Sequence, residues 1–227
     1  MKPLAYFLLL TILACTSPGT HTPPANLAHQ ARVGTTAQTL YDSLGLDALG
    51  LNREAFAVAL RGIRRISPKK PVLLLADMTQ PSTAKRLYVL DLKRKKVTYQ
   101  TYVAHGRGSG GLRPMAFSNQ LNSGQTSLGF YRALGSYRGK HGLSLNLKGL
   151  ERGINDHVFA RNIVLHGADY VCEDTIRRFK MLGRSQGCPA VPNALSLPLI
   201  QAAEGGACLF IYYPDPTYLS TSALAAP

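Results

Sequence analysis

The chain has 227 residues, 45% of them hydrophobic and 17% charged, and its 26 Lys and Arg against 12 Asp and Glu give a formal net charge of +14. This length favours one domain with its own hydrophobic core, and the composition excludes a disordered, collagen-like or coiled-coil chain. No apolar run reaches the roughly 18–20 residues that a membrane-spanning helix needs. The sequence therefore indicates a folded, loop-rich domain.

The first residues have the pattern of an export signal. Lys2 precedes an apolar run over 4–14, which has the length of a signal-peptide core. The run ends in Ile12-Leu13-Ala14-Cys15, which resembles the bacterial lipobox, where cleavage before the Cys allows it to carry lipid. We expect residues 1–14 to be a lipoprotein signal peptide and Cys15 to be the lipid anchor. An ordinary signal peptide with an incidental Cys is the alternative.

Residues 15–34 are rich in Pro, Thr, Ser and Gly, without a hydrophobic period, and are typical of a flexible tether. Together with the signal they predict a location on the periplasmic side of the bacterial cell envelope, where nucleic acid is a poor partner. The positive charge then suits anionic wall polymer or lipid headgroups, although a solvated face would have the same composition.

Residues 35–70 read as a helical preface to the main domain. Asn52 can cap a helix that ends at Ser67-Pro68. The apolar positions of this helix are Phe56, Leu60 and Ile63.

From Pro71 the pattern changes to short strands with Gly-rich connections. Residues 193–203 have helical spacing, and the run over 93–96 suits a hairpin turn. We therefore expect an α+β, β-dominated fold, with the main domain over 71–216 and a tail over 217–227. The expected strands are 72–76, 86–90, 96–103, 127–132, 143–147, 162–165 and 208–212.

One segment carries a chemical pattern. An apolar, strand-like run delivers His166-Gly167, and 19 residues after His166 comes Ser185-Gln186-Gly187-Cys188-Pro189. A thiol attacks as thiolate, which a nearby imidazole or guanidinium favours. His166 can act as general base, and Gly187 lets the backbone turn so that its N–H and that of Cys188 face a developing oxyanion.

This segment resembles the catalytic motif of YkuD-type L,D-transpeptidases, in particular the murein L,D-transpeptidase catalytic domain family. That branch has a Ser-x-Gly-Cys-Pro-Ala motif, which matches residues 185–190. Further similar segments are His105 to Gly110, Phe117-Ser118-Asn119 and Gly139 to Leu145, so the resemblance extends from about Leu74 to Tyr213.

The resemblance implies a YkuD-like, β-sandwich catalytic domain that acts on peptidoglycan stem peptides. Cys188 would attack the L,D amide after the third stem residue and form a thioester, which the amine of another stem resolves. His166 would be the base, oriented by the carbonyl of Gly167. No metal or organic cofactor is implied. Arg184, Ser185, Gln186 and His141 would line the substrate site.

Gln186 stands where the usual motif of the family has His. That position is not the base, so nucleophilic catalysis is retained, while the acceptor can differ. The alternatives are an L,D-carboxypeptidase, in which water replaces the amine, and a non-catalytic wall-binding lipoprotein.

The remaining His and Cys residues leave three questions open. His105 or His141 could support the site, and a zinc centre would need both to converge with His166 and Asp169. No short His-His spacing favours such a centre. Cys172 and Cys208 could form a disulfide or remain two buried thiols.

Overall fold

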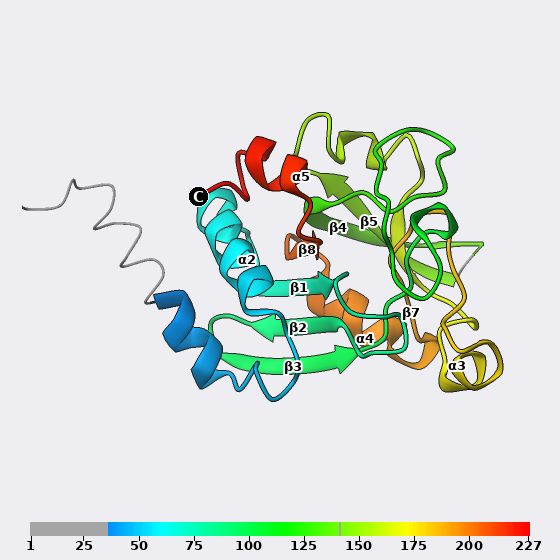
Figure 1. Cartoon of the computed structure of the whole chain (residues 1–227), viewed down its shortest axis with the longest axis horizontal. Helices are drawn as coiled ribbons and strands as arrows, with labels where there is room; N and C mark the ends of the chain where they lie inside the picture. Colours follow the sequence, from blue (N-terminus) through cyan, green and yellow to red (C-terminus); the bar gives the residue numbers. More distant parts are fainter. Residues whose placement is uncertain (1–35, 141) are drawn as a thin grey trace, which may run out of the picture.

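The strands of the computed structural model, which describes residues 36–140 and 142–227, form one hydrogen-bonded sheet in the order β3-β2-β1-β8-β4-β5-β6-β7 (Figure 1). The expected signal peptide, Cys15, the tether over 15–34 and His141 lie outside the described residues. The strands are β1 (Val72–Asp77), β2 (Leu87–Asp91), β3 (Lys96–Thr101), β4 (Gly129–Gly139), β5 (Gly142–Gly149), β6 (Val164–Gly167), β7 (Ala190–Val191) and β8 (Cys208–Tyr212).

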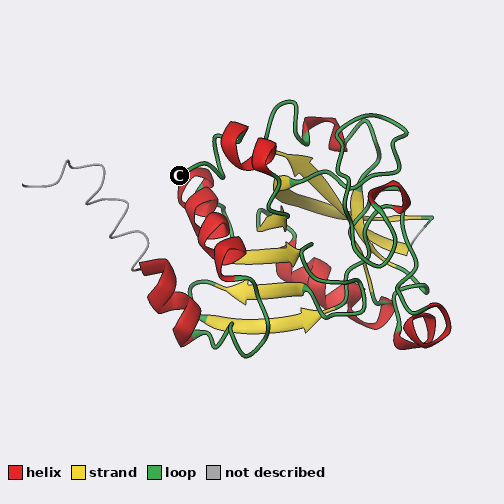
Figure 2. Ribbon diagram, in the orientation of Figure 1, coloured by secondary structure: helices red, strands yellow, loops and turns green. Residues whose placement is uncertain are grey.

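The sheet is mixed, and its two parallel pairs connect distant parts of the chain. β8 inserts between β1 and β4, parallel to the former and antiparallel to the latter. β6 pairs with β7 in parallel, and the other neighbours are antiparallel. In Figure 2, β1–β3 run at a clear angle to β4 and β5, as expected for a twisted sheet.

Helices cover the sheet and fill the connections. Residues 36–43 are helical, and the α-helices that follow them are α2 (Arg53–Ile66), α3 (Glu173–Phe179), α4 (Asn193–Ala203) and α5 (Pro216–Thr221). Two short 3-10 helices, η1 (Arg107–Ser109) and η2 (Asp156–Val158), lie in the loops. No helix within 36–140 or 142–227 is long and apolar enough to span a membrane.

The core lies where α2 crosses the centre of the sheet. Phe130 of β4 and Phe210 of β8 stack with ring centroids 4.0 Å apart. A Cβ on Gly62 would lie 2.1 Å from the Phe130 ring, so only glycine lets α2 approach this closely. Both Phe rings are fully buried, which is worth roughly 1.5–3 kcal/mol for each side chain.

The helix predicted around Phe56 is confirmed, with the expected ends. The Asn52 side chain accepts a hydrogen bond from the Ala55 N–H at 3.0 Å, and Ser67 ends the helix in a left-handed conformation. Two arginines near the helix end also hold the chain terminus: Arg65 donates to the carbonyl of Ala223 at 2.8 Å, and Arg61 to that of Ala225 at 3.2 Å.

The predicted β-dominated α+β class is confirmed, and each expected strand overlaps an observed one. β8 has the predicted bounds, whereas β4 extends to Gly139 and forms a long hairpin with β5. The sequence pattern missed β7, α3 and α5. Residues 217–227 include most of α5 and the buried Tyr218 and Ala225. The domain boundaries named above stay predictions.

Candidate active site

β6 delivers His166 to the centre of the candidate site. All four residues of this strand are buried, and only 2% of His166 is exposed. Its Nδ1 lies 2.7 Å from the carbonyl oxygen of Gly167. Since a carbonyl only accepts, Nδ1 carries the proton and the neutral ring has its lone pair on Nε2. The carbonyl of Gly167 therefore holds the His166 ring in this orientation.

β7 begins two residues after Cys188 and pairs with the strand that carries His166. His166 and Ala190 are direct partners across the parallel pair, and Cys188 precedes Ala190 by two residues. Cys188 is thus level with Val164, one side-chain repeat from His166. In ideal parallel strands, positions related in this way have Cα atoms ~8 Å apart. This short parallel pair is what joins two segments that are remote in sequence.

The Cys188 thiol is set into the protein rather than on its surface. The residue is 9% exposed, and its Sγ lies 3.8 Å from the carbonyl oxygen of Asn162. Burial raises the pKa of the Cys188 thiol, while the backbone N–H of Val164 and the positive charges of Arg161 and Lys140 act in the opposite direction. The thiolate is therefore disfavoured by desolvation and favoured by the groups around it.

Ser185 holds the loop that carries Cys188. Its hydroxyl donates to the carbonyl of Cys188 at 2.7 Å and accepts from the N–H of Gly187 at 3.0 Å. Its backbone joins the loop to the preceding segment, where its N–H donates to the carbonyl of His105 at 3.0 Å. The Ser185 side chain thus shapes the loop from a buried position.

The loop corrects one expectation for the oxyanion site. Because the N–H of Gly187 is bound to Ser185, it does not face a developing oxyanion. Gly187 is needed for its backbone conformation instead: its φ is +128°, and a Cβ would lie 2.7 Å from the carbonyl oxygen of Gln125. The Thr126 hydroxyl donates to the Gly187 carbonyl at 3.3 Å, so the Cys188 N–H of the same trans peptide points the other way. That N–H is the remaining expected oxyanion donor.

A groove of about 270 Å³ lies beside Gly167. Lys140, Asp169, Tyr170 and Asn193 line it, and Asn193 donates to Asp169 at 2.5 Å. Burial is the main cause that raises the pKa of Tyr170 to about 12, and the nearby Cys188 adds to this effect. The groove therefore lies next to Gly167, with one cation and one carboxylate on its walls.

Sequence reasoning assigned no substrate-binding role to these groove residues or to Arg161. Lys140 is at the tip of the β4–β5 hairpin, and the pairing of Ser144 with His166 carries that tip past Gly167. No local sequence pattern predicts that the tip of this hairpin lies beside Gly167. Of the expected substrate-site residues, Arg184 and Gln186 are exposed, and Arg184 donates to the carbonyl of Gly110 at 3.0 Å.

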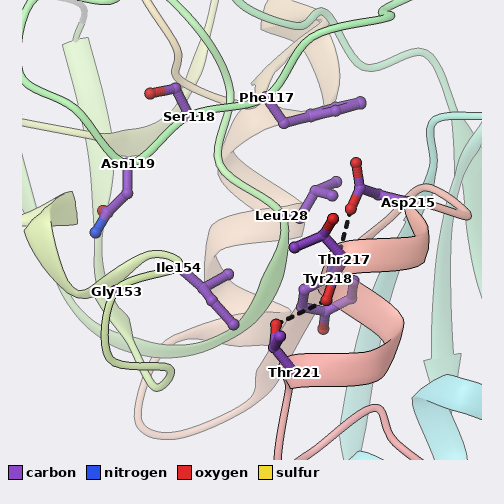
Figure 3. Close-up of a pocket in the computed structure, with 10 residues that line it drawn as sticks. All are labelled: Phe117, Ser118, Asn119, Leu128, Gly153, Ile154, Asp215, Thr217, Tyr218 and Thr221. Carbon is purple, nitrogen blue, oxygen red and sulfur yellow. Dashed lines mark hydrogen bonds between the residues drawn. The ribbon is translucent and has the colours of Figure 1, made fainter.

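A second pocket, also of about 270 Å³, is shown in Figure 3. Phe117 lies on one side, Ile154 on another, and Asp215 and Tyr218 of the α5 region on a third (Figure 3). None of the residues predicted for catalysis lines it, so the groove beside Gly167 is the better substrate site.

His105 is buried and contacts Arg86 and the backbone of Gly110. Arg86 donates to its Nδ1 at 2.8 Å, and its Nε2 lies 3.4 Å from the carbonyl of Gly110. Burial and the adjacent Arg86 lower the pKa of His105 to about 4. Within the described part of the chain, no cluster of His, Cys, Asp or Glu could hold a metal ion.

Cys172 and Cys208 are free thiols, which corrects the disulfide alternative. Cys208 lies inside the sheet on β8, fully buried, and Cys172 is a half-buried residue at the start of α3, 3.3 Å from the Thr175 hydroxyl. The expectation that both are buried therefore holds only for Cys208.

Comparison with known proteins places the chain in a family. A model of the L,D-transpeptidase catalytic domain matches residues 47–212, which is most of the chain. The protein therefore belongs to the L,D-transpeptidase catalytic domain family, and the resemblance noted in the sequence is confirmed. No curated protein matches the sequence.

Several solved structures are similar to this chain. An L,D-transpeptidase from Mycobacterium smegmatis is 13% identical over 63% of this chain and 59% of that chain, with a TM-score of 0.39. The helical cell shape determining protein Pgp2 from Campylobacter jejuni is 15% identical over 65% and 50%, with a TM-score of 0.44. An L,D-transpeptidase from Stackebrandtia nassauensis is 15% identical over 79% and 77%, with a TM-score of 0.38. The chain thus spans about half to three fifths of the first two.

Proposed function

We propose that the protein is a cysteine L,D-transpeptidase that acts on peptidoglycan stem peptides. The observation that carries this proposal is the parallel pairing of His166 with Ala190, two residues after Cys188, beside an open groove. Membership of the L,D-transpeptidase catalytic domain family supports the same reaction.

In the first half of the reaction, Nε2 of His166 takes the thiol proton while Sγ of Cys188 bonds to the carbonyl carbon of the L,D amide. The N–H of Cys188 donates to the oxyanion that forms on the carbonyl oxygen. As the carbon–nitrogen bond breaks, His166 returns its proton to the departing D-alanine amine. The stem peptide is then held as a thioester on Cys188.

In the second half, an amine from another stem attacks the thioester carbon and passes a proton to His166. The carbon–sulfur bond breaks, and the sulfur recovers that proton as the new amide leaves. The exposed Lys140 offers a cation to a substrate carboxylate, and Asp169 offers a carboxylate to an ammonium group.

The test is incubation of the purified protein with tetrapeptide muropeptides, followed by mass spectrometry. Cross-linked dimers with loss of D-alanine are the expected product, and Cys188→Ala should make none. Cys172→Ala, which removes a half-buried thiol at the start of α3, is the matched control and should keep wild-type turnover. Trimmed tripeptides alone would identify an L,D-carboxypeptidase instead, and unchanged substrate retained by the protein would identify a binding protein.

We further propose that the protein is anchored in the bacterial cell envelope by lipid on Cys15. The lipobox-like motif before this residue supports the proposal. Cys15→Ala should move the protein out of the membrane fraction and remove the lipid mass from its N-terminal peptide. An unmodified Cys15 peptide in the wild-type protein would contradict it.

A further inference from the structure

Arg161 approaches the Cys188 loop from the turn that precedes β6. A Cβ placed on Gly187 would lie 3.0 Å from the terminal guanidinium nitrogen Nη2 of Arg161. The next residue, Asn162, directs its carbonyl to the Cys188 sulfur at 3.8 Å. Two successive residues of this turn therefore contact the loop, one with a charge and one with a carbonyl.

The guanidinium also fastens a third segment. Its Nη1 donates to the carbonyl of Ser118 at 2.7 Å and to the hydroxyl of Ser127 at 2.6 Å. Its Nη2 donates to the hydroxyl of Ser123 at 3.2 Å and to the carbonyl of Gln125. The forked side chain thus holds segment 118–127 against the loop of the candidate nucleophile.

The four oxygens that accept from Arg161 belong to carbonyl and hydroxyl groups, which carry no formal charge. They satisfy the guanidinium without neutralising it. The side chain is half-buried, where charges are screened less than at the surface. Its positive charge therefore acts on the ionisable groups around it, which include Tyr131 and Cys188, and Cys188 and Arg161 each favour the charged form of the other.

We propose that Arg161 is a positioning residue of the Cys188 centre, which clamps segment 118–127 to the catalytic loop and presents an uncompensated positive charge to the sulfur. The four terminal N–H groups of the fork are already engaged, so Arg161 acts through Cys188 and not as a ligand of the substrate. This inference rests on the proposed role of Cys188 as nucleophile.

The first test measures the thiol itself. In a Cys172→Ser background, the rate of Cys188 alkylation by iodoacetamide is followed against pH by peptide mass spectrometry. Arg161→Gln should lower the rate at pH 7 about tenfold, because each unit of increase in thiol pKa lowers the thiolate fraction tenfold. Arg161→Lys, which keeps the charge, should stay within about threefold of wild type. Arg64→Gln removes an equal charge from an exposed position on α2 and should change nothing.

A second variant keeps Arg161 in place. The Ser123 hydroxyl accepts hydrogen bonds from the Arg161 guanidinium and from the Gln125 N–H. Ser123→Asp keeps an acceptor for both groups and adds a negative charge beside the guanidinium. It should slow Cys188 alkylation at pH 7 about threefold or more. This variant carries the test if Arg161→Gln does not fold.

Turnover on tetrapeptide muropeptides distinguishes the two roles proposed for Arg161, which are holding segment 118–127 and supplying a positive charge. Arg161→Lys should lower kcat tenfold or more while its alkylation profile stays near wild type, because an ammonium cannot replace the fork. Unchanged alkylation profiles in both Arg161→Gln and Ser123→Asp would overturn the proposal. Absence of turnover in the wild-type protein would overturn the proposed function, and the alkylation profiles would still decide the role of Arg161.

Discussion

Nδ1 of His166 is 2.7 Å from the carbonyl oxygen of the residue that follows it, Gly167. A Cβ at position 167 would lie 2.4 Å from the Asn193 side-chain oxygen, so a larger residue there would displace the Asn193 side chain. A single backbone carbonyl thus sets both the tautomer and the ring orientation. In the proposed mechanism, this main-chain carbonyl takes the place of the carboxylate that orients the histidine of a Ser-His-Asp triad.

This geometry predicts that His166→Ala loses turnover by roughly 10²–10⁴, the usual contribution of a positioned general base. The loss should be in kcat, measured by release of D-alanine from tetrapeptide muropeptides. His157→Ala, which alters an exposed histidine on η2, is the control and should retain wild-type kcat. A His166→Ala protein with near-wild-type kcat would remove this residue from the mechanism.

The burial of Cys188 predicts an alkaline pH dependence. Desolvation raises the pKa of this thiol above its ordinary value near 9. A raised pKa means that the thiolate is scarce at neutral pH, so in the unliganded protein alkylation should accelerate steadily from pH 7 to 9 without a plateau. Peptide-resolved iodoacetamide labelling measures this. A plateau already reached at pH 7 would mean that His166 and Cys188 rest as an ion pair.

Much of the fold was predictable because the signals are local. Asn52 caps the first long helix through its own side chain, and the apolar runs at 72–76 and 208–212 are strands because a fully buried strand needs no alternation. β7 was missed because two residues, Ala190 and Val191, give no period at all. Its existence depends on pairing with β6, which is a tertiary contact.

Some residues of the candidate site could also be predicted from local sequence, and others could not. Cys188 and His166 were predicted from residue type and spacing, and the role of Gly167 from the family resemblance. The structure pairs His166 with Ala190, two residues after Cys188. Arg161 and Lys140 were not predicted, since a single cation in a basic chain has no distinguishing pattern. The prediction that the Gly187 N–H would face the oxyanion was wrong, because the sequence alone does not show that this N–H donates to the Ser185 hydroxyl.

Lys140 supplies a prediction about substrate binding. Its side chain lines the groove beside Gly167 and is exposed, so a contact with a substrate carboxylate is worth only part of the roughly 1.5–3 kcal/mol of a charged hydrogen bond. Lys140→Gln should raise KM for a tetrapeptide stem about three- to tenfold. Lys93→Gln, in the exposed β2–β3 turn, removes the same charge and should leave KM unchanged. An unaltered KM in Lys140→Gln would exclude this cation from substrate recognition.

The buried pair of Arg86 and His105 predicts a loss of stability in acid. Nη2 of Arg86 lies 2.8 Å from Nδ1 of His105, and both residues are fully buried. Burial, together with the Arg86 charge, lowers the pKa of His105 from 6.5 to about 4. The unfolded chain therefore binds a proton at a higher pH than the folded one, so the contribution is complete above about pH 6.5 and is lost as the pH falls toward 4.

The pKa difference of this histidine corresponds to a loss of up to about 3 kcal/mol in the free energy of unfolding between these limits. Urea unfolding of the wild type at pH 7.5 and at pH 4.5 measures the decline. In His105→Gln, whose amide can accept from Arg86 without titrating, the decline should be smaller by most of that amount, because the contribution of His105 is then absent. Equal declines in the two proteins would mean that His105 titrates normally, and Arg86 would then have to tolerate a second cation beside it.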